Sequence, residues 1–316
     1  MLDFVKIFAP ASVANVSCGF DSIGFAVDNM GDEMTFLKTS KKGITIKNIT
    51  GAQGLSLDPS KNVAGIVALA MLREYSVDFG IEITMNKGFS PGSGLGSSAA
   101  SSAGAAFGVN QLLNKPFSNL ELTKFAMLGE KIACGAPIAD NVAAVIFGGF
   151  ILIRSYEPLD VIKLPVPKDL RLVAIHPQIE IKTKDAREVL PDQIPLSIAV
   201  KQWANVGGLI SGLYTKDYKL ISNSLIDEIV EPKRKHFIPY FDLVKEEAIN
   251  AGALGAGISG SGPTIFSLCE GDSIVENVYK AIKKAYKNKN VDFRLFSSKI
   301  NTEGIKILEA KTQFTS

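Results

Sequence analysis

The sequence predicts an α+β fold in two domains, and three observations support this prediction. The chain has 316 residues, whereas a single domain usually holds roughly 100 to 200. Strand and helix patterns follow one another in mixed order with short meanders, as in α+β proteins. The proline-rich stretch LPVPKDL, residues 164–170, is typical of a linker. We therefore expect one domain over residues 1–163 and a second over residues 164–316.

The first half contains both strand and helix patterns. Residues of alternating or β-branched pattern predict strands at 5–9, 25–27, 33–38, 43–49 and 81–85. An amphipathic helix is expected at 63–75, and a second helix at 97–113, where small apolar residues all round indicate burial against a sheet. Ser118 and Glu121 form a capping box, which predicts a third helix ending near Cys134. The run IFGGFILIRS, residues 146–155, predicts a buried strand.

The second half begins with a predicted strand at residues 171–176. Helical patterns follow at residues 197–214, 218–230 and 240–250. Beyond them we expect a strand, a helix and a strand up to Phe296. The lysines between Lys280 and Lys289 are expected on a solvated helix face rather than on a phosphate track.

Charge and histidine content exclude two classes of function. The 34 Lys and Arg against 32 Asp and Glu give a net charge of +2, whereas a nucleic-acid binder generally has a strong basic excess. We therefore expect no nucleic-acid partner. The two histidines, His176 and His236, cannot form a multi-histidine zinc site, which excludes histidine-based metal hydrolysis.

Cysteine usage and hydropathy predict a cytoplasmic protein. The three cysteines are odd in number and far apart, which fits a reducing compartment better than a disulfide framework. The longest apolar run, residues 142–153, is interrupted by Gly148 and Gly149 and is shorter than the roughly 20 residues that cross a bilayer. We expect no membrane association, and the first residues show no export signal.

The glycine-rich segment FSPGSGLGSSAASSAGAA, residues 89–106, is the sharpest local feature of the sequence. Its glycines let backbone N–H groups close on an anion, and the helix that follows adds unpaired N–H groups and a positive dipole end. The alternative is a loop that merely allows close packing. The segment from Gly94 to Ala99 matches the dinucleotide pattern but lacks its later acidic strand end, and the chain has no Gly-Lys pair for a Walker A loop.

A second glycine stretch, GALGAGISGSGPTIF, occupies residues 252–266. Pro263 fixes its exit into an apolar strand, so the loop could approach a ligand closely or form only a tight turn. Because ligand sites favour domain interfaces, two such loops on separate domains favour a shared site.

Six segments of the chain, in order and over nearly its whole length, resemble the homoserine kinase family within the GHMP kinase superfamily. They are APASVANVSCGFDSIGFAV (9–27), PGSGLGSSAA (91–100), GAPIADNVAAVIFGG (135–149), DAREVLP (185–191), EPKRKHFIP (231–239) and GAGISGSGPTIFSL (255–268). The resemblance implies a GHMP kinase fold with a ribosomal-protein-like N-terminal domain and a ferredoxin-like α+β C-terminal domain. It also implies ATP-dependent phosphorylation of the side-chain hydroxyl of L-homoserine, on the route to threonine.

The same resemblance assigns the nucleotide site. Asn62 and Val63 would lie near the adenine, and Ser98 and Glu130 match the positions of the Mg²⁺ ligands, a donor pair that suits this hard cation. The residues that would cradle the ATP phosphates are Pro91, Gly92, Ser93, Gly94, Leu95, Gly96, Ser97, Ser98, Ala99, Ala100 and Ser101.

The resemblance also assigns contacts to the amino-acid substrate. Asn15 and Asp21 match those to the amine, Arg187 and Arg234 those to the carboxylate, and Asn141 the one to the hydroxyl. Arginine suits a planar carboxylate because it can pair with both oxygens.

Asp140 is a candidate base, although direct transfer of the proton to a phosphate oxygen is the path we favour, since phosphoryl transfer needs mainly placement and charge neutralisation. Many homoserine kinases carry histidine where this chain has Ile138. No role for that histidine is therefore carried over.

Two alternatives stay open at this point. Another small-molecule kinase of the superfamily could keep both glycine loops, but a sugar or isoprenoid alcohol would not need an amine and carboxylate clamp. A non-catalytic binding module of the same fold is the other, and the balanced charge argues against it. A homodimer is an expectation of the family.

Overall fold

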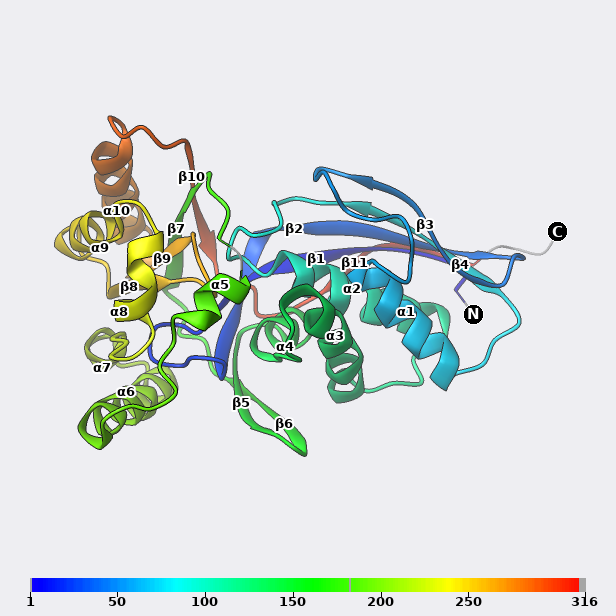
Figure 1. Cartoon of the computed structure of the whole chain (residues 1–316), viewed down its shortest axis with the longest axis horizontal. Helices are drawn as coiled ribbons and strands as arrows, with labels where there is room; N and C mark the ends of the chain where they lie inside the picture. The colour runs from blue at the N-terminus through cyan, green and yellow to red at the C-terminus, as the bar shows by residue number, and fades with distance from the viewer. Residues whose placement is uncertain (1, 182, 313–316) are drawn as a thin grey trace.

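A large sheet with helices on one side and a smaller sheet domain beside it make up the molecule (Figure 1). The computed structural model describes residues 2–181 and 183–312. Within these residues one sheet has seven strands and the other has four, and the mixed helix and strand content confirms the α+β prediction.

The seven-stranded sheet has the order β11-β1-β2-β4-β3, and β5 extends it by pairing with β2 and β6. All its neighbours pair antiparallel except β3 and β4. Its strands are β1 (Phe4–Ala14), β2 (Ile23–Thr39), β3 (Gly43–Thr50), β4 (Gly80–Asn86), β5 (Phe150–Tyr156), β6 (Leu159–Leu164) and β11 (Lys306–Lys311).

The two predicted strands at 25–27 and 33–38 are one continuous strand, β2. It pairs with β1 over most of its length. A register shift between Pro10 and Ser12 of β1 accommodates the irregular residues that separate the two predicted strands. Asn29 adopts a positive φ of 57° within β2, as a bulge residue does. A strand can therefore bend here without ending.

Four helices cover one side of this sheet (Figure 1). They are α1 (Val63–Glu74), α2 (Ser97–Leu112), α3 (Asn119–Cys134) and α4 (Asp140–Phe147). Helix α2 packs against β1 and β2 as well as the other three helices, which explains why it is apolar or small all round. The capping box of Ser118 and Glu121 is present and starts α3.

The predicted strand at residues 146–155 is partly wrong. Ile146 and Phe147 end α4, Gly148 and Gly149 turn the chain with positive φ values of 66° and 72°, and β5 begins at Phe150. A short apolar run cannot by its periodicity be told from a buried helix.

The four-stranded sheet has the antiparallel order β10-β7-β9-β8. Its strands are β7 (Leu170–Pro177), β8 (Gly255–Ile258), β9 (Ile265–Glu270) and β10 (Phe293–Lys299). The helices of this half are α5 (Thr183–Glu188), α6 (Leu196–Thr215), α7 (Tyr218–Ser224), α8 (Glu231–Arg234), the 3₁₀ turn η1 (Lys235–Phe237), α9 (Phe241–Asn250) and α10 (Gly271–Tyr286).

The predicted helix at 218–230 ends early, at Ser224. The carboxylate of Asp227 accepts hydrogen bonds from the N–H groups of Ile229, Val230 and Glu231 and so stabilises a separate turn before α8. The chain then returns: β11, which follows the small sheet, pairs with β1 of the large one. The predicted boundary at 163/164 falls at the last residue of β6, six residues before β7 begins at Leu170, and residues 306–311 return to the first sheet.

Candidate active site

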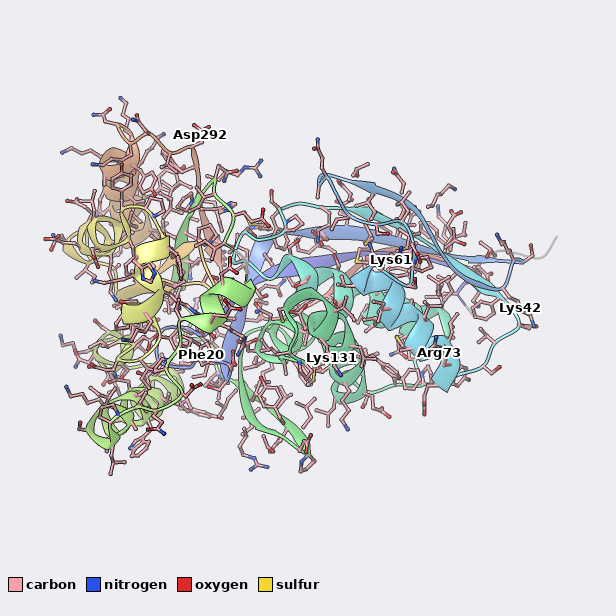
Figure 2. All side chains as sticks on the ribbon, in the orientation of Figure 1. Phe20, Lys42, Lys61, Arg73, Lys131 and Asp292 are labelled. Carbon is pink, nitrogen blue, oxygen red and sulfur yellow. The ribbon has the colours of Figure 1, made fainter. Side chains whose placement is uncertain are left out.

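A cleft of about 720 Å³ lies where the two halves of the molecule meet. Figure 2 shows Phe20, one of its lining residues, between the two halves. The lining residues from the large-sheet half are Ala14, Asn15, Phe20, Asp21, Pro91, Gly92, Gly94, Gly96, Ser97, Ser98, Glu130, Ala133, Cys134, Gly135, Ile138, Asp140 and Asn141. Those from the small-sheet half are Glu180, Ile181, Arg187, Arg234, Gly260 and Ser261.

The first glycine loop lines this cleft and leads directly into α2. Gly92, Gly94 and Gly96 have positive φ values of 72°, 80° and 71°, a conformation that favours glycine. Gly96 is the N-cap of α2 and has no side chain to satisfy the first N–H groups of the helix. These groups, with the positive end of the helix dipole, form an anion site.

The second glycine loop contacts the first through side-chain hydrogen bonds. The Ser259 hydroxyl donates to the Gly94 carbonyl at 2.6 Å, and the Thr264 hydroxyl donates to the Ser93 carbonyl at 2.6 Å. A Cβ on Gly94 would lie 2.7 Å from the Ser259 carbonyl oxygen. The two loops therefore pack too closely for any side chain at that position.

Ser98 and Glu130 both line the cleft beside the glycine loop. Burial raises the pKa of Glu130 to about 7, while the Ser98 hydroxyl and the charge of Lys87 act in the opposite direction. Oε1 of Glu130 is buried and has no hydrogen-bond partner within the part of the chain that is described. A buried, unsatisfied carboxylate oxygen beside a hydroxyl fits a divalent cation, whose ligands are oxygens.

Protein groups alone do not form a metal cage here. Among residues 2–181 and 183–312, no group of three or more His, Cys, Asp or Glu side chains lies close enough together to hold a metal ion. A cation would therefore need phosphate oxygens besides Ser98 and Glu130, as Mg²⁺ commonly has in kinases.

The other predicted nucleotide residues do not line the cleft. Asn62 is the N-cap of α1, where its side chain accepts from the Ala64 N–H and donates to the Ser56 carbonyl, and Val63 begins that helix. The remaining loop residues, which pack behind the cleft surface, are Ser93, Leu95, Ala99, Ala100 and Ser101.

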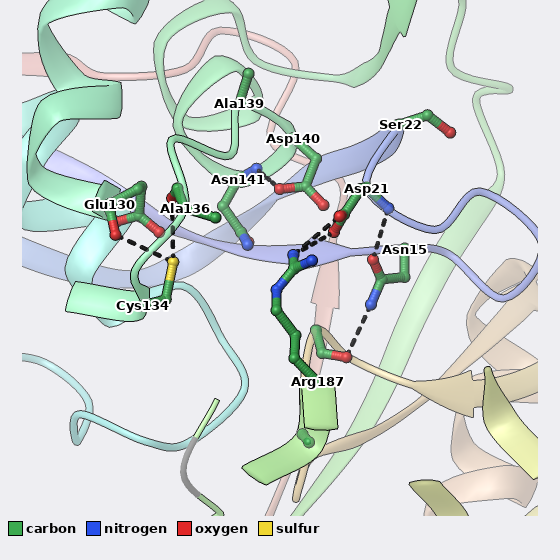
Figure 3. A network of polar contacts seen from close by, with 12 residues as sticks. Asn15, Asp21, Ser22, Glu130, Cys134, Ala136, Ala139, Asp140, Asn141 and Arg187 are labelled. Carbon is green, nitrogen blue, oxygen red and sulfur yellow. Dashed lines mark hydrogen bonds and ion pairs between the residues drawn. The ribbon is translucent and has the colours of Figure 1, made fainter. Parts of the chain in front are cut away.

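The same cleft carries the predicted substrate residues. Nη2 of Arg187 lies 2.9 Å from both carboxylate oxygens of Asp21 (Figure 3). The Asn15 side chain donates to the Gly260 carbonyl at 2.8 Å, and its oxygen accepts from the Asp21 N–H. Arg234 donates to the same Gly260 carbonyl at 3.2 Å. The structure thus brings Asn15, Asp21, Arg187 and Arg234 together from both halves.

Asp140 and Asn141 lie at the start of α4, facing Asp21 and Arg187 (Figure 3). Burial, followed by the charge of Asp21, raises the pKa of Asp140 to about 8. The Asn141 side-chain oxygen accepts from the Ser12 hydroxyl at 2.7 Å, which fixes the orientation of the amide. Ile138 also lines the cleft.

Three residues of the site lay outside the sequence predictions. Phe20 contacts both arginines, with its ring centre 5.5 Å from the guanidinium carbon of Arg187 and 5.2 Å from that of Arg234. Tyr156 donates to the Asp21 carbonyl and accepts from the Ala139 N–H. Ser12 fixes Asn141. Only Phe20 could have been singled out from sequence, since it adjoins a predicted substrate residue.

Comparison with known proteins gives consistent matches. Residues 62–149 match the family model of the GHMP kinases N terminal domain and residues 209–288 that of the GHMP kinases C terminal domain. The chain is 44% identical over 317 residues to the homoserine kinase of Chlorobium phaeovibrioides, covering 96% of this chain and 99% of that protein. It is 43% identical over 315 residues to that of Chlorobaculum tepidum, covering 95% and 97%.

A solved structure agrees with these matches. The crystal structure of homoserine kinase from Cytophaga hutchinsonii superposes with a TM-score of 0.94 at 50% sequence identity and covers 98% of both chains.

Proposed function

The chain belongs to the GHMP kinases, within their homoserine kinase family, and from this premise we propose that it transfers the γ-phosphoryl group of ATP to the side-chain hydroxyl of L-homoserine. The observation that carries this proposal is the arrangement of the cleft. An anion-binding helix terminus lines the same cleft as two guanidinium groups and one carboxylate.

The substrate has one positive and one negative group, and the cleft offers a partner for each. Asp21 and Asn15 would bind the ammonium group, and Arg187 and Arg234 the carboxylate, for which a guanidinium is the best-matched donor. Asn141, oriented by Ser12, would bind the hydroxyl. The hydroxyl would then point toward the glycine loop and the phosphates bound there.

The transfer itself needs little from the protein beyond placement. The homoserine hydroxyl oxygen forms a bond to the γ-phosphorus as the bond from that phosphorus to the β,γ-bridging oxygen breaks, ADP leaves, and the hydroxyl proton passes to a phosphate oxygen. N–H groups of the α2 terminus stabilise the charge that develops on the phosphate oxygens. Asp140, mostly protonated near pH 7, serves as a hydrogen-bond donor in the cleft rather than as a base.

Mg²⁺ is the cofactor that we propose beside ATP. Ser98 and Glu130 would hold it, because the unsatisfied Oε1 of Glu130 is an oxygen donor directly at the phosphate loop. When bound, the ion would neutralise phosphate charge.

We also propose a cytoplasmic location and a homodimer. Cys18, Cys134 and Cys269 are free thiols, which fits a reducing compartment. Among helices of the described residues, none combines the length and the apolar character that crossing a membrane takes. For the dimer, α6 presents Leu196 and Trp203, exposed by 71% and 56%, which is an apolar surface suited to a second copy. Sedimentation of Trp203→Glu beside the unchanged protein would test it.

ADP release with ATP and Mg²⁺ tests the proposed function. The acceptors are L-homoserine, L-serine, mevalonate and galactose, with a reaction lacking acceptor as background. Two further analogues test the amine and carboxylate contacts separately, since 4-hydroxybutyrate lacks the amine and homoserine amide lacks the carboxylate. The kcat/KM of each should be at least about 100-fold lower than that of L-homoserine. Turnover of mevalonate or galactose without turnover of homoserine would refute the substrate assignment.

A further inference from the structure

A buried ion pair, Asp32 with Lys87, lies behind the glycine loop and plays no part in the proposed chemistry. Asp32 belongs to β2, and Lys87 directly follows β4. Because Glu33 pairs with Asn86 in the antiparallel register, Asp32 and Lys87 are the next residues to face each other. Their side chains are only 0% and 1% exposed.

The pair is completely hydrogen-bonded. The Lys87 ammonium group donates to the Asp32 carboxylate, to the Ser97 carbonyl at 2.9 Å and to the Ser101 hydroxyl at 2.8 Å, so its three protons have three acceptors. Asp32 also accepts from the Ser101 hydroxyl and from the Gly88 N–H. The network therefore joins two strands of the sheet to the first turn of α2.

Stability alone is a weak reason to bury these charges. A buried ion pair often contributes no more than a well-packed apolar pair of the same volume, because both charges lose their hydration. The contacts of this pair, however, are directed at one place. Ser97 and Ser101 are four residues apart and share one face of α2, and the neighbouring Ser98 lines the cleft.

We propose that Lys87 is a positioning residue for the nucleotide, which acts with Asp32 by fixing the first turn of α2 against the sheet. Fixing two points one turn apart sets both the rotation and the height of that turn, and with them the direction of its free N–H groups. The inference uses the proposed function only in taking a nucleoside phosphate as the ligand.

The test separates positioning from folding. Lys87→Met alone leaves a buried carboxylate unpaired and is expected to unfold readily. The double variant Asp32→Leu with Lys87→Met replaces the pair by apolar groups and should keep a melting temperature within a few degrees of that of the unchanged protein. Its Kd for ADP without Mg²⁺, measured by calorimetry, should rise at least about 10-fold, while the Kd for homoserine changes less than about twofold.

Two further variants complete the design. Ser101→Ala keeps the ion pair and removes one anchor, so its Kd for ADP should rise about 3- to 10-fold, the equivalent of one hydrogen bond. The matched control is the pair of Lys38, near the C-terminal end of β2, and Asp3, with a separation of 3.5 Å. Replacing it by Met and Leu should leave both Kd values unchanged.

Unchanged ADP affinity in Ser101→Ala and in a folded double variant would overturn the inference, as would an equal loss of ADP and homoserine binding. The two proposals can fail separately. If the unchanged protein binds ADP but not homoserine, the substrate assignment is wrong. The role of Lys87 can still be tested in that case, because it is measured by the Kd for ADP.

Discussion

Replacing Asp140 by asparagine should leave turnover nearly intact, within about threefold of the unchanged enzyme. The carboxyl lies at the start of α4, and its pKa of about 8 exceeds the ordinary value of 3.8 because of burial and, second, the charge of Asp21. At pH 7 only about one tenth of the molecules carry an ionised Asp140. Asparagine reproduces the protonated form, since its oxygen can keep the bond from the Asn141 N–H, 2.7 Å long in the structure.

The pH profile of kcat gives the same distinction independently. If ionised Asp140 were an essential base, the active fraction would rise from about one tenth at pH 7 to about nine tenths at pH 9, and kcat would rise about 10-fold. Without a base at this position, the profile should be the same in Asp140→Asn and in the unchanged enzyme. ADP release under saturating ATP and homoserine measures both quantities.

Stability provides a control that Asp140 has the assigned pKa. Between about pH 4 and pH 8, Asp140 is protonated in the folded chain but ionised in the unfolded chain. Folding must therefore take up a proton, and the contribution of this group to the free energy of folding becomes less favourable as pH rises through that window. Asparagine does not titrate. The melting temperature of Asp140→Asn should therefore exceed that of the unchanged protein by an amount that grows up to about pH 8. A fall of 100-fold or more in kcat, in a variant that shows this stability gain, would refute the reasoning.

Three other changes test the rest of the cleft. Glu130→Gln should raise the Mg²⁺ concentration for half-maximal activity at least about 10-fold while stabilising the fold above pH 7, since the pKa of about 7 reflects a buried charge; an unchanged Mg²⁺ titration would contradict the metal assignment. Gly94→Ala should lower the free energy of unfolding by about 1–3 kcal/mol or raise the KM for ATP, because Gly94 has a φ of +80° and an added Cβ would clash with the Ser259 carbonyl. Full activity with an unchanged melting curve would contradict this expectation. Arg234→Lys should raise the KM for homoserine at least about 10-fold with little change in that for ATP, and Arg171→Lys, outside the cleft, serves as its control.

The sequence predicted those parts of the molecule that local patterns determine. The glycines of the phosphate loop, the capping box at Ser118 and the apolar surface of α2 each have a local physical cause, and each lies where it was expected. Residues 146–155 show where this approach fails, because α4 and β5 are both apolar and only the turn at Gly148 separates them.

Contacts between distant segments were not predictable in the same way. Asp32 and Lys87 meet only because β2 and β4 are antiparallel neighbours in one particular register, and a shift of one residue would separate them. The same holds for Tyr156, which reaches Asp21 from a strand 135 residues further along the chain. Motif resemblance located the charged substrate residues, but the groups that orient them became visible only in the folded chain.

The ion pair of Asp21 and Arg187 explains why the cleft should select a zwitterion. The two side chains are about one third exposed, 31% and 30%, and such pairs contribute little net stability, so separating them costs little. An amino acid that brings an ammonium group to Asp21 and a carboxylate to Arg187 replaces one ion pair by two, and Arg234 adds a further partner for the carboxylate. A neutral alcohol would have to part the same pair without offering a charge to either residue. We infer that the cleft discriminates against sugars and other uncharged alcohols mainly through this uncompensated separation.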